Sequence, residues 1–211
     1  HMHFLLSKGG LYKVYNNNLL YHGCIPLNED GSFKSVKIYG RSYKGKALYE
    51  VLESYVRKGF YAIDEKERKR GKDMMWYIWL SENSPLFGKD KMATFERYFL
   101  AEKETHKEKK NPYYDFLEND KVVDRILKEF GLEHSFSHII NGHMPVKSKN
   151  GENPMKCGGK VFVIDGGFSR AYQKETGIAG YTLIYNSYGM ILSAHEPFES
   201  KESAIENETD I

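Results

Sequence analysis

The sequence predicts an α+β protein in which a helical block interrupts a β structure. Three observations indicate this class. Short apolar runs separated by turn residues occur near both ends of the chain, helical stripes fill residues 45–131, and aromatic residues make up 14% of the chain. We therefore divide the chain into a β segment (3–44), a helical insert (45–131), a second β segment (132–198) and a polar, flexible tail (199–211).

The first β segment begins with two short apolar runs inside residues 11–24, and the Asn-rich turn Asn16–Asn18 lies between them. Residues 36–39 predict a further short strand.

The insert opens with apolar residues at positions 48, 51, 52, 55 and 56, which is one face of a helix, and Gly59 is expected to end it. The apolar run 74–80, MMWYIWL, predicts a buried helix, although seven residues are also compatible with a strand. Residues 92–110 are expected to be helical. A last stripe over 122–130 predicts a helix closed by Gly131.

Strands return in the second β segment. Residues 136–140 and 161–164 predict single strands, with a polar loop over 147–159 between them. Residues 181–185 and 190–194 predict a hairpin.

Size and composition narrow the class of protein. The chain has 211 residues and a net charge of +2, so composition gives no reason to expect nucleic-acid binding. No apolar run reaches the roughly 18 residues of a membrane span, and no signal peptide is recognisable. We expect a cytoplasmic protein with no membrane partner, in which Cys24 and Cys157 are reduced thiols.

Two histidines end predicted strands. His22 precedes Gly23, and His143 follows Gly142; a proline redirects the chain shortly after each histidine. Dinuclear phosphoesterase sites use ligands presented in this way, because loops at strand ends converge on one metal. Each histidine could equally be a strand-end residue with a local hydrogen bond.

Four further residues could bind substrate. Arg41 and Lys44, with Lys46 beside them, form a Gly-flanked basic cluster just ahead of a helix, the kind of place where anions bind. Arg170 follows a Gly-Gly turn and is a second cation candidate. Asp165 ends a strand, where it could be a ligand, an acid–base group or a turn cap.

These segments together resemble a known family. HGCIP (22–26), NGHMPV (141–146), VIDGG (163–167) and YTLIY (181–185) occur in the order found in calcineurin-like metallophosphoesterases. The longer segments LYKVYNNNLLYHGCIPLNEDG, YGRSYKGKALY, INGHMPVKSKNGENP and IDGGFSRAYQKETGIAGYTLIYNSYG resemble class III fructose-1,6-bisphosphatase. The resemblance covers nearly the whole chain from about Leu5.

The resemblance implies part of a calcineurin-like β-sandwich flanked by helices, and hydrolysis of fructose 1,6-bisphosphate to fructose 6-phosphate in gluconeogenesis. It also implies Mn²⁺ as cofactor, with His22 and His143 as ligands of one metal of a dinuclear site. The family's other metal motifs, DxH, GDxxDR and GNH[DE], do not occur in this sequence.

We therefore expect a C-terminal part of the enzyme, inactive alone and binding metal weakly, whose partner is the N-terminal half. An apolar face left without that half could cause self-association. The alternatives are a non-catalytic binding or assembly module with a phosphatase-like shell, or another calcineurin-like phosphatase.

Overall fold

The computed structural model describes residues 1–133, 135–165, 176–177, 180–195 and 200–208. After helix α1 (Met2–Lys8), strands β1 (Tyr12–Tyr15) and β2 (Asn18–Tyr21) form an antiparallel hairpin. Asn16 and Asn17 make its turn with φ angles of 47° and 60°. Asparagine tolerates this left-handed region better than most residues, so the predicted Asn-rich turn is confirmed.

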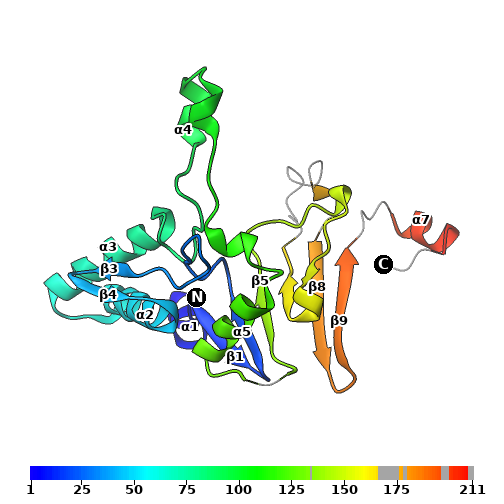
Figure 1. Cartoon of the computed structure of the whole chain (residues 1–211), viewed down its shortest axis with the longest axis horizontal. Helices are drawn as coiled ribbons and strands as arrows, with labels where there is room; N and C mark the ends of the chain where they lie inside the picture. The colour runs from blue at the N-terminus through cyan, green and yellow to red at the C-terminus, as the bar shows by residue number, and fades with distance from the viewer. Residues whose placement is uncertain (134, 166–175, 178–179, 196–199, 209–211) are drawn as a thin grey trace.

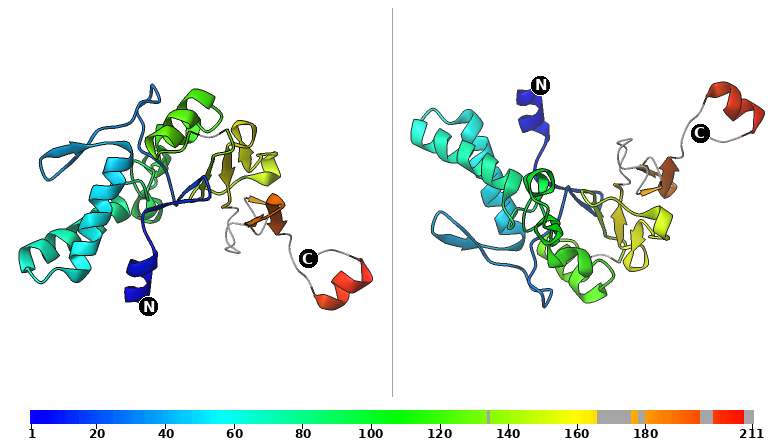
Figure 2. Two further views of the ribbon diagram at one scale, coloured as in Figure 1. Left: turned by 90° about the horizontal axis from the view of Figure 1, so that it is seen from below. Right: turned by 90° about the horizontal axis from the view of Figure 1, so that it is seen from above.

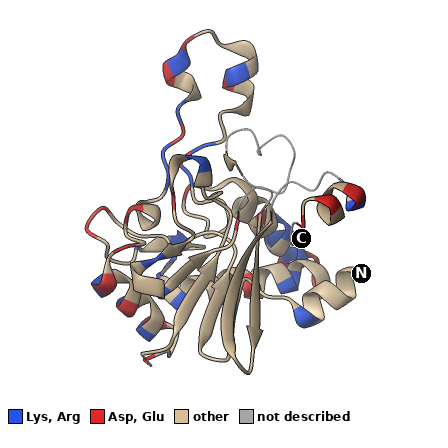
Figure 3. Cartoon of the chain, turned by 90° about the vertical axis from the view of Figure 1, so that its right-hand side faces the viewer, with Lys and Arg blue, Asp and Glu red and all other residues tan. Residues whose placement is uncertain are grey.

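The central sheet has five strands in the order β1-β2-β5-β7-β6. Its remaining strands are β5 (His138–Asn141), β6 (Met155–Lys156) and β7 (Val161–Val163). β2, β5 and β7 run parallel to one another. Their carboxyl ends therefore meet at one edge of the sheet. The strands carry few charged side chains. Most Lys, Arg, Asp and Glu residues lie on the helices and connecting segments (Figure 3).

Helix α5 (Asp120–Glu129) packs on this sheet (Figure 1). The side chain of Asn119 caps its first turn by accepting a hydrogen bond from the amide of Val122. Val123 and Ile126 are buried in the main core with strand residues such as Leu19 and Ile139. Gly131 follows the helix with a φ of 80°, so the predicted stripe and its end are confirmed.

A second core lies between helices α2 (Gly45–Tyr61) and α3 (Glu65–Leu80) and the small hairpin of β3 (Val36–Ile38) and β4 (Arg41–Tyr43). The expectation that Gly59 ends the first helix is wrong, since α2 continues to Tyr61. Gly59 instead lies against Gly71 of α3, where a Cβ would overlap the facing backbone. The two glycines let the helices approach closely.

The run 74–80 is helical, but it is only the second half of α3, and the expectation that it is buried is wrong in part. Met74 and Ile78, one turn apart, face the second core. Trp76 and Trp79 point away from it and are 68% and 67% exposed. The reason is that one stripe of this helix packs into the second core, whereas the two indoles lie outside that stripe.

Residues 92–110 do not form the long helix expected from the sequence. They contain α4 (Thr94–Phe99) and the 3₁₀ turn η1 (Lys103–His106), carried on an arm that leaves the body of the molecule (Figure 1). Neither helical piece has a buried residue, so no packing supports a longer helix. The turn η2 (Pro112–Asp115) returns the chain to the core.

The C-terminal hairpin is confirmed as β8 (Gly180–Asn186) paired with β9 (Gly189–His195). Figure 2 shows it on the opposite side of the molecule from α2 and α3. The predicted loop 147–159 holds the turns η3 (Ser148–Asn150) and η4 (Cys157–Gly159) as well as β6, and α7 (Lys201–Glu206) lies in the expected tail. The described residues thus form an α+β fold.

Two further observations concern the cysteines and the question of a membrane-spanning helix. Cys24 and Cys157 are both free thiols and buried, and burial raises the pKa of Cys24 to about 12. Among the described helices, none combines the length and apolar character that a bilayer crossing requires.

Candidate metal and phosphate site

Three chemically capable residues follow the three parallel strands. His22 comes directly after β2, His143 two residues after β5, and Asp165 two residues after β7. In sheets with parallel strands, ligands bind outside the carboxyl ends, where the following loops converge. Parallel pairing therefore brings together residues that are 121 positions apart in the case of the two histidines.

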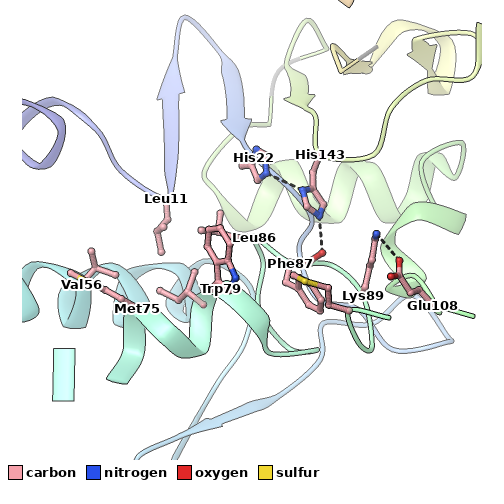
Figure 4. A pocket seen from close by; sticks show the side chains of 12 residues that line it. Leu11, His22, Val56, Met75, Trp79, Leu86, Phe87, Lys89, Glu108 and His143 are labelled. Atoms are coloured by element: carbon pink, nitrogen blue, oxygen red, sulfur yellow. Dashed lines mark hydrogen bonds and ion pairs between the residues drawn. The ribbon is translucent and has the colours of Figure 1, made fainter. Parts of the chain in front are cut away.

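The two imidazoles lie against each other (Figure 4). Nε2 of His22 is 3.0 Å from Nδ1 of His143, and the rings meet edge to face with centroids 4.8 Å apart. The sequence-based expectation was an approach within about 5 Å if both bound one metal. Nitrogen ligands about 2.1 Å from one cation and about 90° apart would lie about 3 Å from each other. The spacing suits a shared cation or a direct hydrogen bond.

The backbone of the insert fixes the tautomer of His143. Its Nε2 lies 2.8 Å from the carbonyl oxygen of Phe87. A carbonyl oxygen only accepts hydrogen bonds, so Nε2 carries the proton. In the neutral ring Nδ1 then carries no proton, and its lone pair faces His22. Metal-binding histidines are commonly oriented by a hydrogen bond of this kind at the other ring nitrogen.

Two hydrogen bonds join the loops that carry the histidines. The amide of Gly142 donates to the carbonyl of His22 at 2.9 Å, and the side-chain Nδ2 of Asn141 donates to the carbonyl of Gly23 at 3.1 Å. Asn141 is 2% exposed. It was not singled out in the sequence, although its place at the end of an apolar strand was the available signal.

The turn at His143 is itself unusual. His143 has a φ of 66°, and the amide of Met144 donates to the carbonyl of Gly142 at 2.8 Å, which makes a tight γ-turn centred on the histidine. A left-handed conformation at a residue other than glycine costs about 1–3 kcal/mol and is held by its surroundings. Here two hydrogen bonds provide that support: the His143 ring donates to the Phe87 carbonyl, and the Gly142 amide donates to the His22 carbonyl.

Asp165 lies close to the pair. A Cβ placed on Gly142 would be 3.4 Å from Cβ of Asp165. The pKa of His22 is lowered first by the loss of solvent around its ring, although the residue as a whole is exposed, and then by the neighbouring His143; the Asp165 carboxylate opposes both effects. His22 therefore favours the neutral form, which is the form that binds metals.

The basic candidates lie elsewhere. Arg41 and Lys44 are exposed on and beside the β3–β4 hairpin, apart from the central sheet. The first turn of α2, where an anion was expected, already has a carboxylate: the amide of Lys46 donates to Glu129 at 3.1 Å. Their role in phosphate binding stays a prediction. Arg170 lies outside the described residues.

The ligand set available in this chain is small. Across the described residues no three His, Cys, Asp or Glu side chains are grouped so as to hold a metal ion. Two neutral imidazoles give one half of a coordination shell and no charge compensation. The chemistry of the two imidazoles fits part of a metal site.

Comparison with known proteins identifies the family of this chain. Residues 1–211 match the family model of the Firmicute fructose-1,6-bisphosphatases. The class 3 fructose-1,6-bisphosphatase of Clostridioides difficile (strain 630) is 62% identical over 212 residues, and that of Clostridium novyi (strain NT) is 60% identical over 212 residues. Each match covers 100% of this chain but 32% of the relative.

The chain thus spans about a third of the length of the curated relatives it matches. No solved structure matches it significantly. The match along the whole chain shows that it belongs to the Firmicute fructose-1,6-bisphosphatase family.

Proposed function

We propose that this chain is the C-terminal part of a metal-dependent fructose-1,6-bisphosphatase of the calcineurin-like superfamily. The complete enzyme hydrolyses fructose 1,6-bisphosphate to fructose 6-phosphate and phosphate, in the cytoplasm. The observation that carries the proposal is the 3.0 Å contact of His22 and His143 at the carboxyl ends of adjacent parallel strands. The names of the relatives support the substrate.

In this proposal His22 and His143 supply two neutral nitrogen ligands to one of two metal ions, with Mn²⁺ as the expected metal. When bound, such metals activate water and neutralise charge on the phosphate group. The Phe87 carbonyl holds the Nε2 proton of His143 so that Nδ1 stays free to bind. Arg41, Lys44 and Arg170 are the cation candidates for the phosphates, and Asp165 is a further candidate for substrate binding.

The remaining ligands would come from the N-terminal portion of the longer relatives. A divalent cation of this type prefers oxygen ligands, and this chain brings two nitrogens. We therefore expect the chain alone to bind Mn²⁺ weakly and to have no measurable phosphatase activity.

The test is a phosphate-release assay with fructose 1,6-bisphosphate and Mn²⁺. It compares the chain alone with a single polypeptide in which the N-terminal portion of the Clostridioides difficile relative precedes this chain. The joined protein should be active, and H143A or H22A should lower its kcat at least 100-fold. H106A, on the arm, is the matched control and should leave activity within about twofold.

Activity of the joined protein that survives both substitutions would contradict the assignment of the metal ligands. The second candidate, a non-catalytic assembly module, is favoured by the small ligand set of the described residues. It predicts a well-folded joined protein that releases no phosphate.

A further inference from the structure

A groove of about 570 Å³ opens beside the histidine pair (Figure 4). Its walls are Val56 of α2, Met75 and Trp79 of α3, and the segment Leu86–Phe87, which follows α3. His22 and His143 also line it, between Trp79 on one side and Lys89 on the other (Figure 4). The groove therefore connects the surface of the helical insert with the candidate metal site.

The groove is chemically unsuited to a sugar bisphosphate. Apart from the imidazoles, Lys89 is the one cation among the described residues that line it, and its Nζ is 2.8 Å from the carboxylate of Glu108. Most of the other walls are aliphatic, aromatic or thioether side chains. Phosphate groups need unpaired cations or converging amides, whereas apolar walls favour an apolar occupant.

The exposure of Trp79 indicates a protein occupant. Trp79 leaves 67% of its surface exposed at the edge of the groove, and Met92, also at the groove, is 47% exposed. A large apolar side chain beside an apolar hollow is typical of a residue that anchors an interface. Its surroundings within this chain leave it uncovered.

The length of the relatives is the observation that favours one occupant. About two thirds of each curated relative lies outside the match to this chain, which covers 32% of its length. That additional portion must place metal ligands at the histidine pair, which lines the groove, if the proposed function holds. A segment that reaches the pair and buries its own apolar side chains would cross this groove.

We propose that the groove seats an apolar segment of the N-terminal portion of the complete enzyme, with Trp79 as its anchor. This rests on the proposed function for the identity of the partner. The seated segment would orient the N-terminal portion so that its ligands meet His22 and His143. A second copy of this chain is the competing occupant.

Hydroxyl-radical footprinting tests the proposal with an internal control. Trp76 and Trp79 lie on the same helix and are 68% and 67% exposed, but only Trp79 lines the groove. In the 211-residue chain at low concentration, the two should oxidise at rates within about twofold of each other. In the joined protein described above, oxidation of Trp79 should fall at least fivefold relative to Trp76.

An unchanged ratio, or equal protection of both tryptophans, would overturn the proposal. Selective protection of Trp79 in the chain alone as its concentration rises would assign the groove to a second copy and also overturn it. The phosphate-release assay separates this result from the proposed function. If Trp79 is protected but the joined protein is inactive, the proposed interface stands and the proposed activity is wrong. If the joined protein is active but Trp79 is not protected, the proposed activity stands and the proposed interface is wrong.

Discussion

Replacing Asn141 by alanine probes the link between the two histidine loops. The substitution removes the 3.1 Å hydrogen bond from Nδ2 to the carbonyl of Gly23 at a position that is 2% exposed. It leaves the backbone bond between Gly142 and His22 in place. The loops thus lose one of their three described hydrogen-bond contacts, the other two being the Gly142–His22 backbone bond and the imidazole contact, and the carbonyl of Gly23 loses its buried donor.

The expected cost follows from these contacts. Leaving a buried acceptor without its donor costs about 1–3 kcal/mol. Oδ1 of Asn141 is buried and has no hydrogen-bond partner among the described residues, so removing it recovers part of that cost. We expect N141A to lower the free energy of unfolding by about 1–2 kcal/mol. With a urea m value of about 2 kcal/mol/M, the midpoint should fall by about 0.5–1 M.

Equilibrium urea unfolding followed by circular dichroism measures this change. N83A is the matched control. Within the described part of the chain, Asn83 also has a buried Oδ1 without a partner, and its hydrogen bonds stay within its own loop. Its midpoint should stay within about 0.2 M of the parent. If N141A unfolds at the same urea concentration as the parent, the asparagine does not tie the loops together and this reasoning fails.

Three further predictions concern the site and the helix pair. Nitrogen NMR of the imidazole rings above pH 7 should show His143 with its proton on Nε2, because the Phe87 carbonyl accepts it; a protonated Nδ1 would contradict this. Burial lowers the pKa of His138 and is the largest cause of the lowered pKa of His22. Because both histidines bind protons more readily in the unfolded chain, the free energy of unfolding should fall as the pH drops below about 6.5. Equal urea midpoints at pH 7.5 and 5.5 would count against it. G71A should destabilise the protein by about 1–3 kcal/mol in thermal unfolding despite alanine's better helix propensity, because the new Cβ overlaps the backbone of α2; an unchanged melting temperature would show that the helices separate freely.

Local features of the fold were readable from the sequence. The Asn-rich turn, the stripe of α5 with Gly131 after it and the C-terminal hairpin depend on residues within one element or turn. Such patterns determine local structure because the interactions that satisfy them are near in sequence. The helix over 74–80 was predicted correctly, but its full burial was not, and the long helix over 92–110 was wrong. Burial and helix length depend on what packs against a segment, as the exposed Trp76 and the unsupported α4 show.

In the candidate site, too, some features could be predicted from the sequence and others depend on the tertiary structure. The sequence by itself determined that His22 and His143 lie beside glycines where apolar strands give way to loops, which marks both as candidate ligands. Only the tertiary structure decided that β2 and β5 are parallel neighbours, so that the two imidazoles meet at one edge. It also decided that the Phe87 carbonyl fixes the tautomer of His143. Backbone groups have no residue-specific signature, and strand pairing joins segments more than a hundred residues apart, so neither could be inferred from composition, periodicity or spacing.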